Sequence, residues 1–143
     1  MKVKNIANEL GGKKTLGKVI KNHDQFIALI NEGFPFLSLD HFSSRINMPL
    51  GDLAVVLMIN QRTLARRKRT GQLLPVESDR LARLAKILAY AIEVLGTQEK
   101  ASRWLQKSNH ALKMRPPIQL LDTDIGSVEV ENLLGRIDHG IYS

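Results

Sequence analysis

Six side chains with strong hydrogen-bonding capacity lie close together near the middle of the chain. They are Gln61, Arg62, Thr63, Arg66, Arg67 and Arg69. Arginine can bond guanine in a forked geometry, glutamine can bond adenine, and threonine can reach a phosphate or a thymine methyl group. A helix that exposes this group would therefore suit the major groove of DNA.

The residues that must position this group have the spacing of a helix–turn–helix over residues 50–69. Leu53 and Leu57 lie one helical turn apart, and Ala54 is small enough to let two helices approach. Ile59 would fill the turn, and Leu64 would anchor the second helix to the core. Asn60 can cap that helix, because its side chain can accept a hydrogen bond from an early backbone N–H.

Two positions depart from the usual helix–turn–helix pattern. Met58 stands at a turn position that glycine often holds, and Arg67 stands where an apolar residue is usual. The alternative is a helical hairpin with a solvated basic face. The distribution of charge favours DNA: residues 1–75 contain 12 basic and 5 acidic side chains, whereas residues 76–143 contain 9 of each. We therefore place a seam near Leu74-Pro75, with a DNA-binding region at 1–75 and a second helical region at 76–143.

Residues suited to other chemistry are sparse. The histidines His23, His41, His110 and His139 lack metal-ligand spacing, and the chain has no cysteine. The serines lack the context of a nucleophile, and the glycines form no phosphate-binding loop. We predict no catalytic residue, no metal site and no cofactor.

The 143 residues include 43% hydrophobic and 24% charged side chains, as in globular proteins. The absence of cysteine fits a reducing cytoplasm. No apolar run approaches the length of a membrane span, so we expect a cytoplasmic protein with no membrane partner.

The hydrophobic pattern predicts an all-α protein. Asn22, Ser38 and Thr97 can each cap a helix, Pro49 is expected to open another, and a last helix is expected to begin near Thr123. Residues 1–21 show only a weak pattern.

The strongest pattern lies in residues 78–95, which are apolar on two sides. A helix of this kind is buried centrally or lies at a subunit interface. We expect it to build a homodimer. The expected interface residues are Leu84, Ile87, Leu88, Tyr90, Ala91 and Val94.

Several blocks of the chain, in order, resemble the Xre/MbcA/ParS family of antitoxins. They are Arg62-Thr-Leu-Ala-Arg-Arg-Lys68, Leu74-Pro-Val-Glu-Ser-Asp-Arg-Leu-Ala-Arg-Leu-Ala-Lys-Ile-Leu88, Ala91-Ile-Glu-Val-Leu-Gly96, Ala101-Ser-Arg-Trp-Leu105, Asn109-His-Ala-Leu112, Leu120-Leu-Asp-Thr123 and Leu133-Leu-Gly-Arg-Ile137. The resemblance covers roughly residues 33–143 and departs at Ser108, where the family usually has proline. It implies an Xre-like helix–turn–helix module followed by a toxin-binding module. It also implies a RES-domain toxin that consumes NAD as partner, and repression of the antitoxin's own promoter through operator DNA. The dimer would match a palindromic operator.

The C-terminal segment is the expected toxin-binding surface. Its candidate residues are Leu133, Arg136, Ile137, His139, Ile141 and Tyr142. An aromatic side chain and an arginine are common anchors of interfaces, although the same residues could instead cover the protein's own core. Two other functions stay open: a helix–turn–helix transcriptional regulator with no toxin partner, and an interaction adaptor that never binds DNA.

Overall fold

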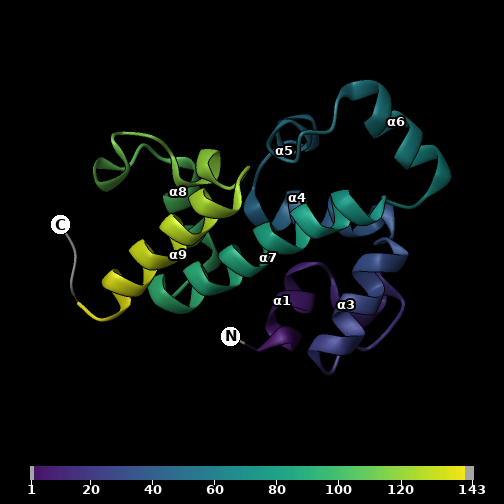
Figure 1. Ribbon diagram of the computed structural model, residues 1–143, viewed down its shortest axis with the longest axis horizontal. Coiled ribbons are helices and arrows are strands. Elements are labelled where there is room, and N and C mark those ends of the chain that lie inside the picture. Colours follow the sequence, from purple (N-terminus) through teal and green to yellow (C-terminus); the bar gives the residue numbers. More distant parts are fainter. Residues whose placement is uncertain (1, 141–143) are drawn as a thin grey trace.

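Residues 2–140, which the computed structural model describes, form nine α-helices and two short 3-10 helices, η1 and η2. The all-α prediction is confirmed. The elements are α1 (Val3–Glu9), α2 (Gly12–Leu16), α3 (His23–Glu32), α4 (Phe36–Ile46), α5 (Leu50–Val56), α6 (Gln61–Thr70), α7 (Pro75–Leu95), α8 (Gln98–Gln106), η1 (His110–Leu112), η2 (Pro117–Leu120) and α9 (Asp124–Asp138) (Figure 1).

The long helix α7 is the centre of the fold. Pro75 opens it at a position where a missing N–H costs nothing, and Gly96 ends it with φ 99, in the left-handed region. Helices α1, α3, α8 and α9 all pack against α7 (Figure 1). The chain therefore covers several sides of α7 with its own helices.

This packing corrects the expected dimer interface. Leu84, Ile87, Leu88 and Ala91 are buried within the single chain, and Tyr90 and Val94 are half-buried against the same core. Of the two explanations for an apolar helix, the structure supports central burial. The four buried residues therefore cannot form a homodimer interface in the folded chain, whereas Tyr90 and Val94 stay partly exposed.

The N-terminal residues are more ordered than their weak pattern suggested. They form α1 and α2, and Val3, Ile6, Ala7 and Leu10 join the core. Helix α1 packs on α7, and α2 packs on α4. The signal was weak because each helix is short and supplies only a few apolar residues.

Most of the expected helix starts are confirmed. The side chains of Asn22, Thr97 and Thr123 each accept a hydrogen bond from a backbone N–H in the first turn, and α5 begins directly after Pro49. Ser38 is the exception: it lies inside α4, which begins two residues earlier at Phe36, and its hydroxyl donates to the Pro35 carbonyl. Within residues 2–140, no helix combines the length and apolar character that crossing a bilayer requires.

Candidate functional site

Helices α5 and α6 form the expected helix–turn–helix. Leu53, Ala54, Leu57 and Ile59 are buried, and Leu64 is partly buried against the core. The side chain of Asn60 accepts a hydrogen bond from the Thr63 N–H at 2.8 Å. The predicted anchors and the predicted cap of the second helix are all present.

The turn explains why Met58 is an unusual residue there. Its φ is 59, in the left-handed region where glycine is favoured. The turn is closed by hydrogen bonds from Met58 N–H to the Val55 carbonyl and from Ile59 N–H to the Ala54 carbonyl. The side chain of Met58 points to solvent, so the departure leaves the turn intact.

Helix α6 presents a basic surface. Gln61, Arg62, Arg66 and Arg69 are exposed, and Thr63 is half-buried. The helix contains no acidic residue along its sequence Gln61-Arg-Thr-Leu-Ala-Arg-Arg-Lys-Arg-Thr70. Four of the six expected DNA-binding side chains are therefore exposed to a polyanion, and Thr63 is partly accessible.

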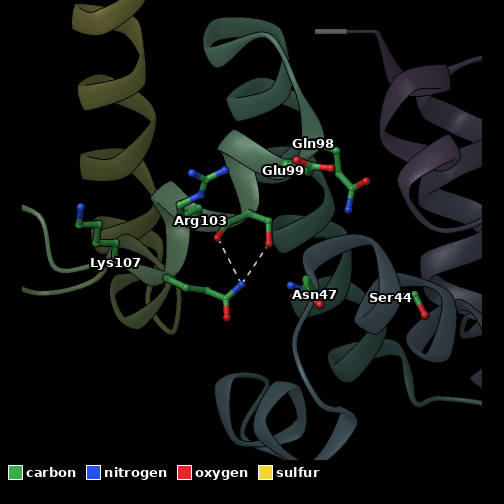
Figure 2. Close-up of a pocket in the computed structure, with 8 residues that line it drawn as sticks. Ser44, Asn47, Gln98, Glu99, Arg103 and Lys107 are labelled. Carbon is green, nitrogen blue, oxygen red and sulfur yellow. Dashed lines mark hydrogen bonds between the residues drawn. The ribbon is translucent and has the colours of Figure 1, made fainter.

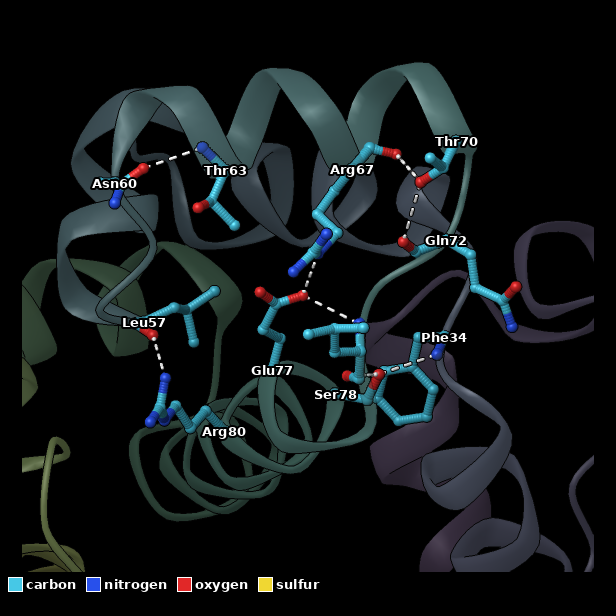
Figure 3. Close-up of polar contacts among 11 residues, drawn as sticks. Phe34, Leu57, Asn60, Thr63, Arg67, Thr70, Gln72, Glu77, Ser78 and Arg80 are labelled. Atoms are coloured by element: carbon cyan, nitrogen blue, oxygen red, sulfur yellow. Dashed lines mark hydrogen bonds and ion pairs between the residues drawn. The ribbon is translucent and has the colours of Figure 1, made fainter.

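Arg67, the sixth, is not exposed as expected. Its side chain is only 12% exposed, and its Nε donates to Oε1 of Glu77 at 2.8 Å (Figure 3). Arg67 therefore faces α7 rather than solvent, which explains why it occupies a position that is usually apolar. Arg80, three residues after Glu77 on α7, donates to the Leu57 carbonyl at 3.1 Å.

The C-terminal surface is built on α9. Arg136 and His139 are exposed and line a shallow hollow of about 580 Å³ together with Tyr90, Glu131, Asn132 and Gly135. Partial burial raises the pKa of the Tyr90 phenol, and the carboxylates of Asp138, Glu93 and Glu131 raise it further. This hollow therefore brings Arg136 of α9 close to the partly exposed ring of Tyr90, which lies on α7.

The other residues expected at this surface behave differently. Leu133 is buried in the chain's own core and cannot contact a partner without unfolding. Ile137 is partly buried against the same core. Ile141 and Tyr142 lie outside the residues that the structure describes.

A polar hollow of about 810 Å³ lies between the end of α4 and helix α8 (Figure 2). Gln98, Ser102 and Gln106 recur every four residues on α8 and bond the last carbonyls of α4. Gln98 donates to the Arg45 carbonyl, while Ser102 and Gln106 donate to the Ile46 carbonyl. These residues hold the helix–turn–helix region against the second half of the chain, and only their regular spacing could have revealed this from the sequence.

Known protein families match both parts of this architecture. A family described as the antitoxin Xre-like helix-turn-helix domain matches residues 25–86, and one described as the antitoxin Xre/MbcA/ParS C-terminal toxin-binding domain matches residues 91–140. Residues 87–90, which separate the two matched regions, lie within α7.

Individual proteins similar to this chain are also antitoxins. An antitoxin Xre of Photorhabdus laumondii subsp. laumondii is 31% identical over 132 residues, which cover 91% of this chain and 89% of the relative. An antitoxin Xre of Yersinia enterocolitica is 29% identical over 144 residues, covering 99% of this chain and 93% of the relative. A chain in the crystal structure of the M. tuberculosis MbcT–MbcA toxin–antitoxin complex shares the fold, with a TM-score of 0.55, 22% identity, and coverage of 73% of this chain and 94% of that one.

The helix–turn–helix and the helical C-terminal region together define a two-part antitoxin rather than an enzyme. The chain belongs to the Xre/MbcA/ParS antitoxin family, as the resemblance of its sequence blocks predicted.

Proposed function

We propose that this antitoxin neutralises a RES-domain toxin that consumes NAD, and that it represses its own operon by binding operator DNA in the cytoplasm. The observation that carries the proposal is the position of the two surfaces. Helix α6 and the C-terminal end of α9 lie at opposite ends of the molecule (Figure 1). A toxin on one end would leave the other free for DNA.

The DNA part rests on the exposed side chains of α6. Gln61, Arg62, Thr63, Arg66 and Arg69 are the proposed contacts, and the absence of acidic residues along α6 favours a phosphate backbone nearby. A symmetrical operator would require two copies of the chain. The proposed homodimer would use a surface other than the buried residues of α7.

Alanine variants of Arg62, Arg66 and Arg69 test the DNA contacts. Each should weaken operator binding by about 1–3 kcal/mol if it contacts a base, measured by band shift with the toxin present. Lys4→Ala is the matched control, because it removes one exposed positive charge from α1, away from α6 (Figure 1). Affinities equal to wild type in all three variants would refute this assignment.

Two changes test the toxin-binding surface in cells that produce the toxin. Deletion of residues 136–143 should abolish neutralisation while leaving operator binding largely intact. Because this deletion also removes the partly buried Ile137, a full-length Arg136→Glu variant should be tested beside it. Glu129→Lys, a charge reversal at an exposed position of the same helix, is the control. Survival equal to wild type with both the deletion and Arg136→Glu would contradict the proposal.

A further inference from the structure

We propose that Glu77 is a positioning residue of the DNA interface: through Arg67 it sets the orientation of helix α6. The proposal rests on the proposed operator binding and names the group that keeps the DNA-contacting helix in place. Glu77 itself lies on α7, and its side chain is 6% exposed, so it is not offered to DNA.

Helix α6 needs such a group because its apolar anchoring is slight. All ten of its residues are described, and none of them is buried, whereas every other α-helix in residues 2–140 has at least one buried residue. Its only core contact of aliphatic character is the partly buried Leu64. The hydrophobic effect therefore does little to select one orientation of α6.

The Arg67–Glu77 ion pair supplies the missing constraint. Nε of Arg67 donates to Oε1 of Glu77 at 2.8 Å, and the same oxygen accepts the Leu74 N–H at 2.8 Å (Figure 3). One carboxylate oxygen thus joins the last turns of α6 to the beginning of α7. About one turn further along α7, Arg80 donates a hydrogen bond to the Leu57 carbonyl, which lies at the end of α5 where the turn to α6 begins.

The pair is better suited to fixing geometry than to adding stability. Taking two charges out of water carries a desolvation cost that offsets much of their attraction. A directional, charge-assisted hydrogen bond still restricts where α6 can lie. Base contacts depend on accurate placement, so loss of the pair should reduce DNA affinity. Removing one partner leaves the other charge buried, so the free energy of unfolding should fall as well, and toxin affinity shows whether the rest of the fold is intact.

Electrostatics alone predicts that neutralising Glu77 changes DNA affinity in the opposite direction. A carboxylate near a DNA-binding surface repels phosphate, so neutralising it would strengthen binding. If Glu77 positions α6, Glu77→Gln weakens binding instead. The glutamine Oε1 can still accept the Leu74 N–H, so the beginning of α7 keeps its cap.

The experiment compares Glu77→Gln and Arg67→Met with Arg67→Lys and Asp52→Asn. Asp52 is an exposed acidic residue in the first turn of α5, and its neutralisation is the matched control. Operator affinity is measured across salt concentrations, α6 by amide hydrogen exchange, and toxin binding by titration calorimetry.

We expect Glu77→Gln and Arg67→Met to lower operator affinity by at least about tenfold. They should also speed amide exchange in α6 while toxin affinity stays at the wild-type value. Arg67→Lys should recover part of the affinity, and Asp52→Asn should bind as well as wild type or better. The slope of log affinity against log salt should not change in Arg67→Met, because this arginine touches no phosphate.

Three results would overturn the proposal. In the first, Glu77→Gln binds the operator as tightly as wild type or more tightly. In the second, the slope of log affinity against log salt falls in Arg67→Met by the amount expected for about one phosphate contact. In the third, both variants lose toxin affinity to the same extent as operator affinity. If the wild-type protein binds no operator at all, the proposed function fails. Amide hydrogen exchange of α6 in Glu77→Gln and Arg67→Met then tests the positioning role by itself. Unchanged protection of α6 refutes this role, and a loss of protection confined to α6 supports it.

Discussion

Glu77, Ser78 and Ser102 are buried polar residues, and each joins two parts of the chain. Ser78 accepts the Phe34 N–H at 2.8 Å and donates to the Leu74 carbonyl at 2.9 Å (Figure 3). Ser102 donates to the Ile46 carbonyl. Within residues 2–140 every fully buried side-chain polar atom has a hydrogen-bond partner, so burial costs little at these positions.

Gly126 is required by a close contact, although it lies inside a helix. A Cβ there would lie 1.9 Å from the Leu120 carbonyl oxygen, whereas a Cβ on Gly51 in α5 would meet no atom within 4 Å. Gly126→Ala should therefore destabilise the protein by about 1–3 kcal/mol, and Gly51→Ala should stabilise it by up to about 1 kcal/mol. Chemical denaturation measures both. Equal effects of the two substitutions would show that α9 can move away from η2 at little cost.

Tyr90 should titrate above its ordinary value of 10.0, because burial and three nearby carboxylates raise its pKa. The folded protein then keeps the phenol proton at pH values where the unfolded chain loses it. Stability from this group is complete below the unfolded pKa and falls as pH rises towards the folded one. The difference between the absorbance titrations of wild type and Tyr90→Phe isolates this group. A midpoint at or below 10.0 would contradict the described surroundings of Tyr90.

Helices of very different apolar content are held by different forces. Helix α1 is held by apolar packing on α7, whereas α6 is held by an ion pair, a capped N-terminus and one partly buried leucine. Local opening is easiest where buried apolar contacts are few. We therefore expect α6 to exchange its amides sooner than α1 or α7.

The packing of α1 gives an element-scale prediction. Ile6 on α1 is 6% exposed, and Ile27 on α3 is 53% exposed. Ile6→Ala should cost about 2–5 kcal/mol of unfolding free energy, whereas Ile27→Ala should stay within about 0.5 kcal/mol. Thermal or urea unfolding provides the comparison. A small effect of Ile6→Ala would mean that residues 2–21 are not part of the cooperative core.

At the scale of the whole molecule, α7 belongs to both halves. Its N-terminal end holds the helix–turn–helix through Glu77, Ser78 and Arg80, and its later turns pack on α8 and α9. The seam expected at Leu74-Pro75 coincides with the first residue of this helix. A single continuous helix therefore connects the two halves.

Central burial of α7 predicts how a core substitution behaves. Leu88→Ala should lower stability by about 2–5 kcal/mol, with a shift of the melting temperature that does not depend on protein concentration. Any homodimer makes the melting temperature rise with concentration, but only a dimer built on α7 would lose that dependence in Leu88→Ala. Light scattering of wild type and variant completes the test. Loss of a wild-type dimer in Leu88→Ala, with the monomer still folded, would restore α7 as the dimer interface.

The sequence alone determined the all-helical class, most helix starts, the helix–turn–helix and the family. These features depend on residues three or four positions apart, such as Asn60 and Thr63 or Leu53 and Leu57, whose relation is set by helical geometry before any packing occurs.

Only the tertiary structure decided which exposed-looking side chains are free and which faces of a helix are covered. Arg67 and Glu77 meet because the chain turns between α6 and α7, and Phe34 meets Ser78 across 44 positions of sequence. The same packing buries Leu84, Ile87, Leu88 and Ala91. It also stabilises two helices, α1 and α2, in the N-terminal residues, whose hydrophobic pattern is weak. An apolar or charged stripe on a helix indicates that other groups must pack against it. Whether those groups belong to the same chain or to another molecule depends on contacts between residues far apart in sequence.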